Sequence, residues 1–130
     1  MTVQQKNIGC WVFRLIASVI MLQTLFFKFT AAPESVYIFS TLGMEPWGRI
    51  GIGLLELIAA VLILIPRTTG KGALLGLGLM TAAIFFHLTR LGLVVQNDHG
   101  MLFLMALVVF CSCLILIYAS YDQLTKFFRT

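Results

Sequence analysis

Four long apolar runs constrain this chain more than any other feature of its sequence. They cover about residues 8–29, 47–65, 72–91 and 101–121. An α-helix needs about 20 apolar residues to cross the hydrocarbon core of a bilayer, and each run is long enough to do so. The runs are continuous, without the alternation of apolar and polar residues that a transmembrane β-strand requires. We therefore expect an all-α integral membrane protein, an antiparallel bundle of four transmembrane helices.

The composition supports this expectation. Of the 130 residues, 60% are hydrophobic and 11% are charged, whereas soluble domains carry about 25% charged residues. A soluble domain of this size buries only about 60–70% of its surface, so lipid must cover the rest. Four spans leave room only for loops and tails. We expect a single transmembrane domain over residues 1–130, without catalytic activity of its own.

The first loop has a pattern of its own. Pro33 and Glu34 suit the start of a helix, because proline fits its first position and an acid suits the positive end of its dipole. Gly43 suits a position just after the last turn. We expect a short helix over Pro33–Leu42 that lies at the membrane interface.

The distribution of Lys and Arg predicts the orientation, because cytoplasmic loops are enriched in both. With the N-terminus in the cytoplasm, five basic residues lie inside and three lie outside. The inner set is Lys6, Arg67, Lys71, Lys126 and Arg129, and the outer set is Lys28, Arg49 and Arg90. We expect a multi-pass protein of the bacterial cytoplasmic (inner) membrane with both termini in the cytoplasm. Arg14, near the inner end of the first span, is expected to extend to the inner headgroups.

Three ionisable residues within the spans are candidates for function: Lys28, Glu56 and His87. Such groups cost about 2.5–3.5 kcal/mol each on insertion scales, so they need a partner, a wet cavity or a route to the interface. Glu56 is too deep and too short to reach the interface. We expect it to pair with Lys28 or with Arg49, and the sequence leaves both open.

Helical spacing extends this set. Arg49 and Glu56 share a face of the second span, His87 and Arg90 are three residues apart on the third, and Gln23 lies near the level of Glu56. The candidate residues for ligand binding or a proton relay are Lys28, Gln23, Arg49, Glu56, His87 and Arg90. The alternative is a purely structural polar layer that holds the helices together.

Other familiar chemistry is not indicated. The sequence has no phosphate-binding glycine loop, no nucleophile elbow and no set of ligands with metal-site spacing. The basic residues are dispersed, so the net charge of +4 does not indicate a nucleic-acid partner. Gly72 and Gly76 form a GxxxG motif, which predicts close helix packing and suggests a homo-oligomer, a dimer.

These residues together resemble the DoxX family of small four-span membrane proteins, over about residues 11–118. The resemblance is carried by Arg14, by Lys28 after Phe26-Phe27, by Leu42-Gly43, by the segment 48–57 with its Glu56-Leu57, by residues 65–68 and by His87. It implies a four-helix bundle. It also implies links to thiosulfate:quinone oxidoreductase, to membrane oxidoreductase complexes and, distantly, to chaperones of membrane receptors.

Three functions follow as hypotheses. The first is a redox-accessory membrane subunit that binds a quinone or another small apolar ligand near Lys28, Glu56 and His87. A soluble redox partner or another membrane protein would then accompany it in the lipid bilayer. The second is a proton-coupled small transporter in which Glu56 titrates. The third is an assembly factor, or chaperone, for other membrane proteins.

Overall fold

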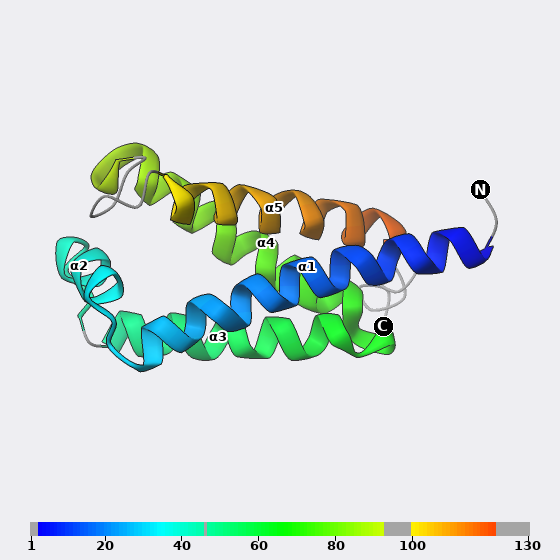
Figure 1. Cartoon of the computed structure of the whole chain (residues 1–130), viewed down its shortest axis with the longest axis horizontal. Coiled ribbons are helices and arrows are strands. Elements are labelled where there is room, and N and C mark those ends of the chain that lie inside the picture. Colours follow the sequence, from blue (N-terminus) through cyan, green and yellow to red (C-terminus); the bar gives the residue numbers. More distant parts are fainter. Residues whose placement is uncertain (1–2, 46, 93–99, 122–130) are drawn as a thin grey trace.

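The computed structural model describes residues 3–45, 47–92 and 100–121, and side-chain positions from residue 8 onward except that of Glu34. Every regular element in these ranges is helical (Figure 1). The long helices are α1 (Val3–Phe29), α3 (Trp47–Leu64), α4 (Thr69–Phe86) and α5 (Met101–Ala119). The short elements are α2 (Pro33–Thr41), the 3-10 turn η1 (Pro66–Thr68) and the π-helical turn η2 (His87–Leu91). Lys126 and Arg129, which enter the charge count above, lie outside the described residues.

The four long helices form a simple up-and-down bundle. α1 packs against α3 and α5, and α4 packs against the same two helices. Consecutive long helices run in opposite directions (Figure 1), which short connections require. Four segments are long and apolar enough to span a membrane: Ile8–Phe29, Trp47–Leu64, Pro66–Leu91 and Met101–Ala119. The expected all-α bundle of four transmembrane helices is confirmed.

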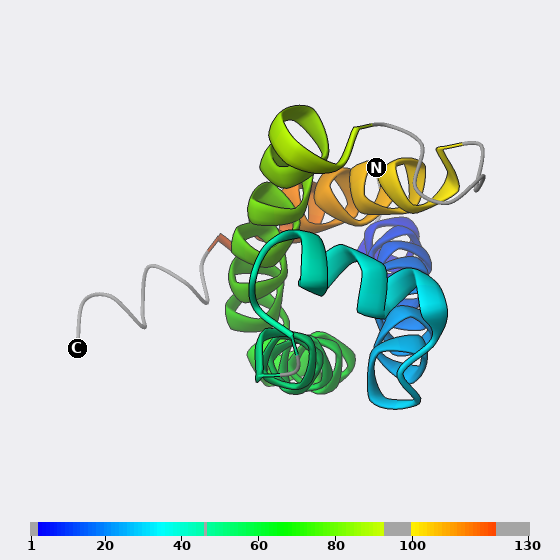
Figure 2. The same cartoon turned by 90° about the vertical axis from the view of Figure 1, so that its left-hand side faces the viewer.

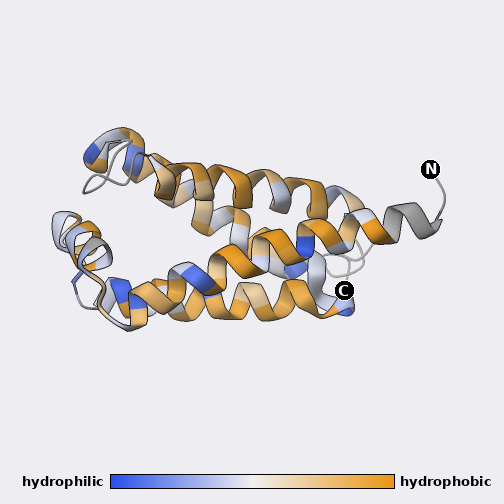
Figure 3. Cartoon of the chain, viewed as in Figure 1, coloured by the Kyte–Doolittle hydropathy of each residue, from blue (hydrophilic) through white to orange (hydrophobic). Residues whose placement is uncertain are grey.

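The outside of the bundle is apolar along most of its length (Figure 3). Large hydrophobic side chains are exposed on every long helix, among them Leu15, Ile58, Phe85 and Leu114. In a water-soluble protein such a continuous apolar surface would be a defect, but in lipid it is the solvated face.

The half of the bundle near the ends of the chain is closely packed by small residues. The fully buried side chains there include Ala17, Ala59, Ala60 and Ala73. A Cβ atom on Gly72 would lie 2.6 Å from the backbone nitrogen of Ile63, so only glycine lets α4 approach α3 this closely. A Cβ atom on Gly76 would lie 3.0 Å from the Sγ of Cys113 on α5. Both glycines of the GxxxG motif therefore serve the bundle itself, and the dimer stays a prediction without their support.

Arg14 differs from the expectation that it extends to the headgroups. Its side chain is buried, and its guanidinium donates hydrogen bonds to the carbonyl oxygens of Ile63 and Leu64, both at 3.0 Å. It also lies 3.7 Å from the centre of the Trp11 ring. The last carbonyls of a helix have no partner within that helix. Arg14 supplies such a partner for the last carbonyls of α3. It therefore stays inside the bundle and does not extend to the headgroups.

The other end of the bundle carries α2, and we refer to it as the α2 end. Figure 2 looks onto this end and shows α2 crossing in front of the long helices. α2 begins with Pro33 at its first position, as expected, and contacts α1, α3 and η2. The chain turns into and out of this segment through backbone with positive φ, 55° at Ala31 and 75° at Gly43. Such values let a chain reverse direction within a few residues.

Candidate functional site

The centre of the candidate site is an ion pair between α1 and α3. The Nζ of Lys28 lies 3.0 Å from Oε1 of Glu56, and the two side chains are 15% and 4% exposed. Lys28 is near the last turn of α1 and Glu56 is in the middle of α3, so the long lysine stem reaches inward along the bundle. Of the two partners that the sequence left open for Glu56, the structure shows Lys28.

Thr24 completes the coordination of the carboxylate. Its hydroxyl donates a hydrogen bond to Oε2 of Glu56 at 2.9 Å, so both carboxylate oxygens have a polar partner. Thr24 lies one turn before Lys28 on the same face of α1, and this spacing could have identified it. Thr24 was not among the residues expected at the site, because an uncharged hydroxyl in a span is common and carries little signal.

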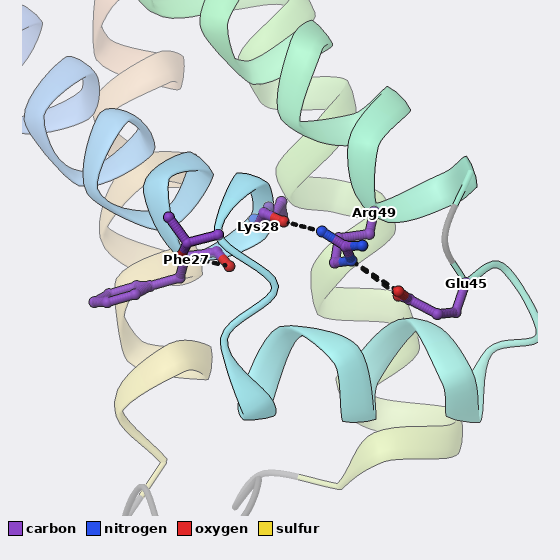
Figure 4. Close-up of polar contacts among 5 residues, drawn as sticks. Phe27, Lys28, Glu45 and Arg49 are labelled. Atoms are coloured by element: carbon purple, nitrogen blue, oxygen red, sulfur yellow. Dashed lines mark hydrogen bonds and ion pairs between the residues drawn. The ribbon is translucent and has the colours of Figure 1, made fainter.

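Arg49 supports the ion pair indirectly, through contacts with the backbone of Lys28 and the side chain of Glu45. Its Nε lies 2.9 Å from Oε1 and 3.0 Å from Oε2 of Glu45, and its Nη1 donates to the carbonyl oxygen of Lys28 (Figure 4). Arg49 therefore ties the end of α1 to the start of α3 and to the segment that follows α2. It contacts the backbone of Lys28, whereas the side chain of Glu56 is held by Lys28 and Thr24.

His87, the next candidate, lies in η2. Its ring is buried, and its Nδ1 lies 3.0 Å from the carbonyl oxygen of Gly92. A carbonyl can only accept, so Nδ1 carries a proton, and in the neutral form of the ring Nε2 is then the acceptor nitrogen. The ring also packs edge-on against Phe103, with centroids 5.5 Å apart. One tautomer and one orientation are thereby fixed.

The two remaining candidates lie further out. Gln23 is exposed on α1, next to Thr24 in the sequence, and takes no part in the hydrogen bond or the ion pair of Glu56. Arg90 is exposed in η2 and is not brought to the other candidates. The expectation that Arg90 lies on the same face as His87 holds only for α-helical geometry. η2 is a π-helical turn, in which the offset between residues three apart differs from that in an α-helix; Arg90 is exposed there, whereas His87 is buried.

A cavity of about 660 Å³ lies between the four long helices at the α2 end. Its polar lining residues are Gln23, Thr24, Lys28, Ser35, Glu56 and His87. Apolar side chains from all four long helices form the rest of the wall, and Ile38, Phe39 and Leu42 from the α2 segment close its end. Phe27 and Phe86 line it, whereas Phe26 is 60% exposed and does not. The bundle is thus packed in one half and hollow in the other.

The fold and this site define a small multi-pass membrane protein whose bundle encloses a cavity with one buried ion pair on its wall. The sequence model of the DoxX-like family matches residues 12–116, most of the chain, so the chain belongs to the DoxX-like family. Comparison with curated proteins and with solved structures gave no match.

Proposed function

We propose that this protein is a membrane subunit that binds one small molecule with an apolar body and a polar head, a quinone, in the cavity at the α2 end. The observation that carries the proposal is the Lys28–Glu56 pair on the wall of a 660 Å³ cavity. Pockets of about 300–1,000 Å³ with mostly apolar walls and a few polar groups are typical ligand sites. A purely structural ion pair would not need an open space beside it.

The polar groups of the wall suit a quinone head. Lys28 offers an ammonium that can donate to a carbonyl oxygen, and Nε2 of His87 offers an acceptor for the hydroxyl of the reduced form. Phe27 and Phe86 add aromatic surface to the same cavity. A ligand of this kind fits a redox-accessory role beside a soluble redox partner or another membrane protein, which would supply or remove the electrons.

A proton-coupled transporter receives less support from the described residues. Transport needs a path to both sides of the membrane, and the cavity lies in one half of the bundle. The other half is filled by buried side chains, among them Ser18, Ala60 and Ile63. No contact among the described residues specifically favours the role of an assembly factor.

We also propose the cellular setting that the sequence predicts. The protein lies in the bacterial cytoplasmic membrane with its termini on the cytoplasmic side, so the α2 end and the cavity face outward. The excess of Lys and Arg in the segments at the termini end supports this orientation.

A binding measurement tests the proposal. The full chain in lipid nanodiscs is titrated with decylubiquinone, and heat of binding is recorded for the wild type and for Glu56→Gln and His87→Ala. We expect a dissociation constant in the micromolar range that rises about tenfold or more in each variant. Thr89→Ala, an exposed position in η2, is the matched control and should leave binding unchanged. Equal binding by all four folded proteins would show that the polar layer is structural.

A further inference from the structure

We propose that the ligand of this cavity carries a long apolar tail, and that this tail leaves the protein sideways between α1 and α5 into the surrounding lipid. The inference rests on the proposed function, because it concerns the same cavity and narrows the class of its ligand. It makes that ligand a polar-headed lipid rather than a compact soluble molecule.

The polarity of the cavity wall changes along α1. Thr24 and Lys28, nearer the α2 end, are polar, whereas Ile20 and Met21, deeper in the bundle, are apolar. Glu56 and His87 add to the polar part from α3 and η2. Ile38, Phe39 and Leu42 of the α2 segment make the end of the cavity apolar again, so a molecule held here has its polar head at the level of the Lys28–Glu56 pair.

The exposed lining residues are the reason for placing the opening of the cavity on the side between α1 and α5. The two helices diverge toward the α2 end in Figure 1, and side chains from both line the cavity. Three of these lining residues are also exposed: Gln23, Phe27 at 40% and Met101 at 53%. Among the described lining residues of α3 and α4, only the small Ala82 is exposed, so most of the exposed lining belongs to α1 and α5.

Gln23 marks the same opening by its chemistry. Its amide is exposed within a membrane span and makes no hydrogen bond to the described residues. An amide turned to pure hydrocarbon without a partner is costly. At the rim of an opening it can instead meet water from the cavity or the head of an entering lipid.

The cavity is too small to hold a whole molecule with a long apolar chain. A space of about 660 Å³ is in the range that holds one drug-sized molecule. A head group with a long isoprenoid or alkyl chain is larger than this, so its chain must project from the protein. Between α1 and α5 the chain meets lipid at once and exchanges one apolar environment for another, without the loss that exposure to water would cause.

A photoreactive quinone tests the route. The probe is a dimethoxy-methyl-benzoquinone with a long alkyl chain that carries a diazirine far from the ring, and the full chain is held in nanodiscs. We expect labels on α1 around Gln23 and Phe27 and on α5 around Met101. Excess 2,3-dimethoxy-5-methyl-1,4-benzoquinone, which has the head but no chain, should compete these labels away.

The other outcomes separate the two proposals. Competed labels around Ile52 and Ala82, or on the inner residues Met80 and Val109, would confirm binding but overturn the sideways exit between α1 and α5. Labels that the head-only quinone does not compete would overturn the proposed function, and this inference with it.

A variant adds an independent measurement. Gln23→Trp should obstruct the opening and weaken binding of the long-chain quinone about tenfold or more, a larger loss than it causes for the head-only quinone. Leu22→Trp is the matched control, because Leu22 is exposed on the same helix and does not line the cavity. Equal affinity of Gln23→Trp and the wild type for the long-chain quinone would contradict the proposed opening.

Discussion

The ammonium of Lys28 and the carboxylate of Glu56 lie 3.0 Å apart on neighbouring helices, inside a segment of the protein that lipid surrounds. Neither charge could remain there alone, because an isolated ion in hydrocarbon loses its hydration without compensation. The pair therefore couples the packing of α1 on α3 to the chemistry of the cavity wall.

Cutting the pair on one side should cost more than neutralising both sides. We expect Lys28→Met to lower the free energy of unfolding by about 3–5 kcal/mol, because it leaves the Glu56 carboxylate buried without its counterion. Combining it with Glu56→Gln should recover a large part of this loss, since the amide can still accept from Thr24. Unfolding in mixed micelles, followed by circular dichroism, measures both. A double variant as unstable as Lys28→Met would refute the account of the pair.

Arg14 should matter for stability, although it lies far from the cavity. Arg14→Leu removes two hydrogen bonds from the last carbonyls of α3, and hydrogen bonds from charged donors contribute about 1.5–3 kcal/mol each. We expect a loss of at least about 2 kcal/mol in the same unfolding measurement. Arg90→Leu removes an exposed arginine and serves as the control, with little change expected. If the two variants were equally stable, Arg14 would not cap α3.

Two glycines of α4 should respond in opposite ways to the same substitution. Gly72→Ala places a methyl group against the backbone of α3, where nothing can yield, and should destabilise the bundle by about 1–3 kcal/mol. A Cβ atom on Gly78 meets nothing within 4 Å, so Gly78→Ala should be neutral or stabilising by up to about 1 kcal/mol. Similar melting temperatures for the two variants would exclude a close α3–α4 contact at Gly72.

The proposed orientation can be tested by labelling. In a background without Cys10, Cys111 and Cys113, single cysteines are placed at Tyr37 in α2 and at Pro66 in η1, both exposed positions. A membrane-impermeant maleimide added from outside should label Tyr37→Cys in intact cells and leave Pro66→Cys unlabelled until the membrane is opened. The reverse pattern would place the termini and the closed half of the bundle outside.

Much of the fold could be predicted from the sequence, because lipid imposes one dominant rule. Spans must be long, apolar and helical, so the four runs and the Pro33 helix start are readable directly. The inward face of α1 was also readable, since Arg14, Ser18 and Lys28 share one helical face, and all three point into the bundle.

The pairing within the site was less accessible. Choosing between Lys28 and Arg49 as partner of Glu56 depends on how the helices rotate about their axes, which hydropathy does not specify. Arg49 and Glu45 are four positions apart in the sequence, so their contact could have been predicted from spacing alone. The π-helical turn, in which Arg90 is exposed, could not be predicted from hydropathy or from helical spacing.

A ligand site near Lys28, Glu56 and His87 was expected, and the cavity lies there, but the sequence did not show why the bundle is open at this level. Small residues such as Ala59, Ala60 and Gly72 allow close helix packing at one end, whereas a cavity remains between the helices at the other. A list of apolar residues does not show this difference. It depends on which side chains meet at the same level of the bundle.

The most direct test of the central claim, that the cavity is a ligand site, is native mass spectrometry of the protein purified in mild detergent. The wild type should carry one non-covalent small-molecule adduct that collisional activation releases. Ala83→Phe, which fills the cavity, should lack this adduct, whereas Thr81→Phe, an exposed position on the same helix that does not line the cavity, should keep it. An adduct carried equally by Ala83→Phe, or absent from the wild type, would contradict the account.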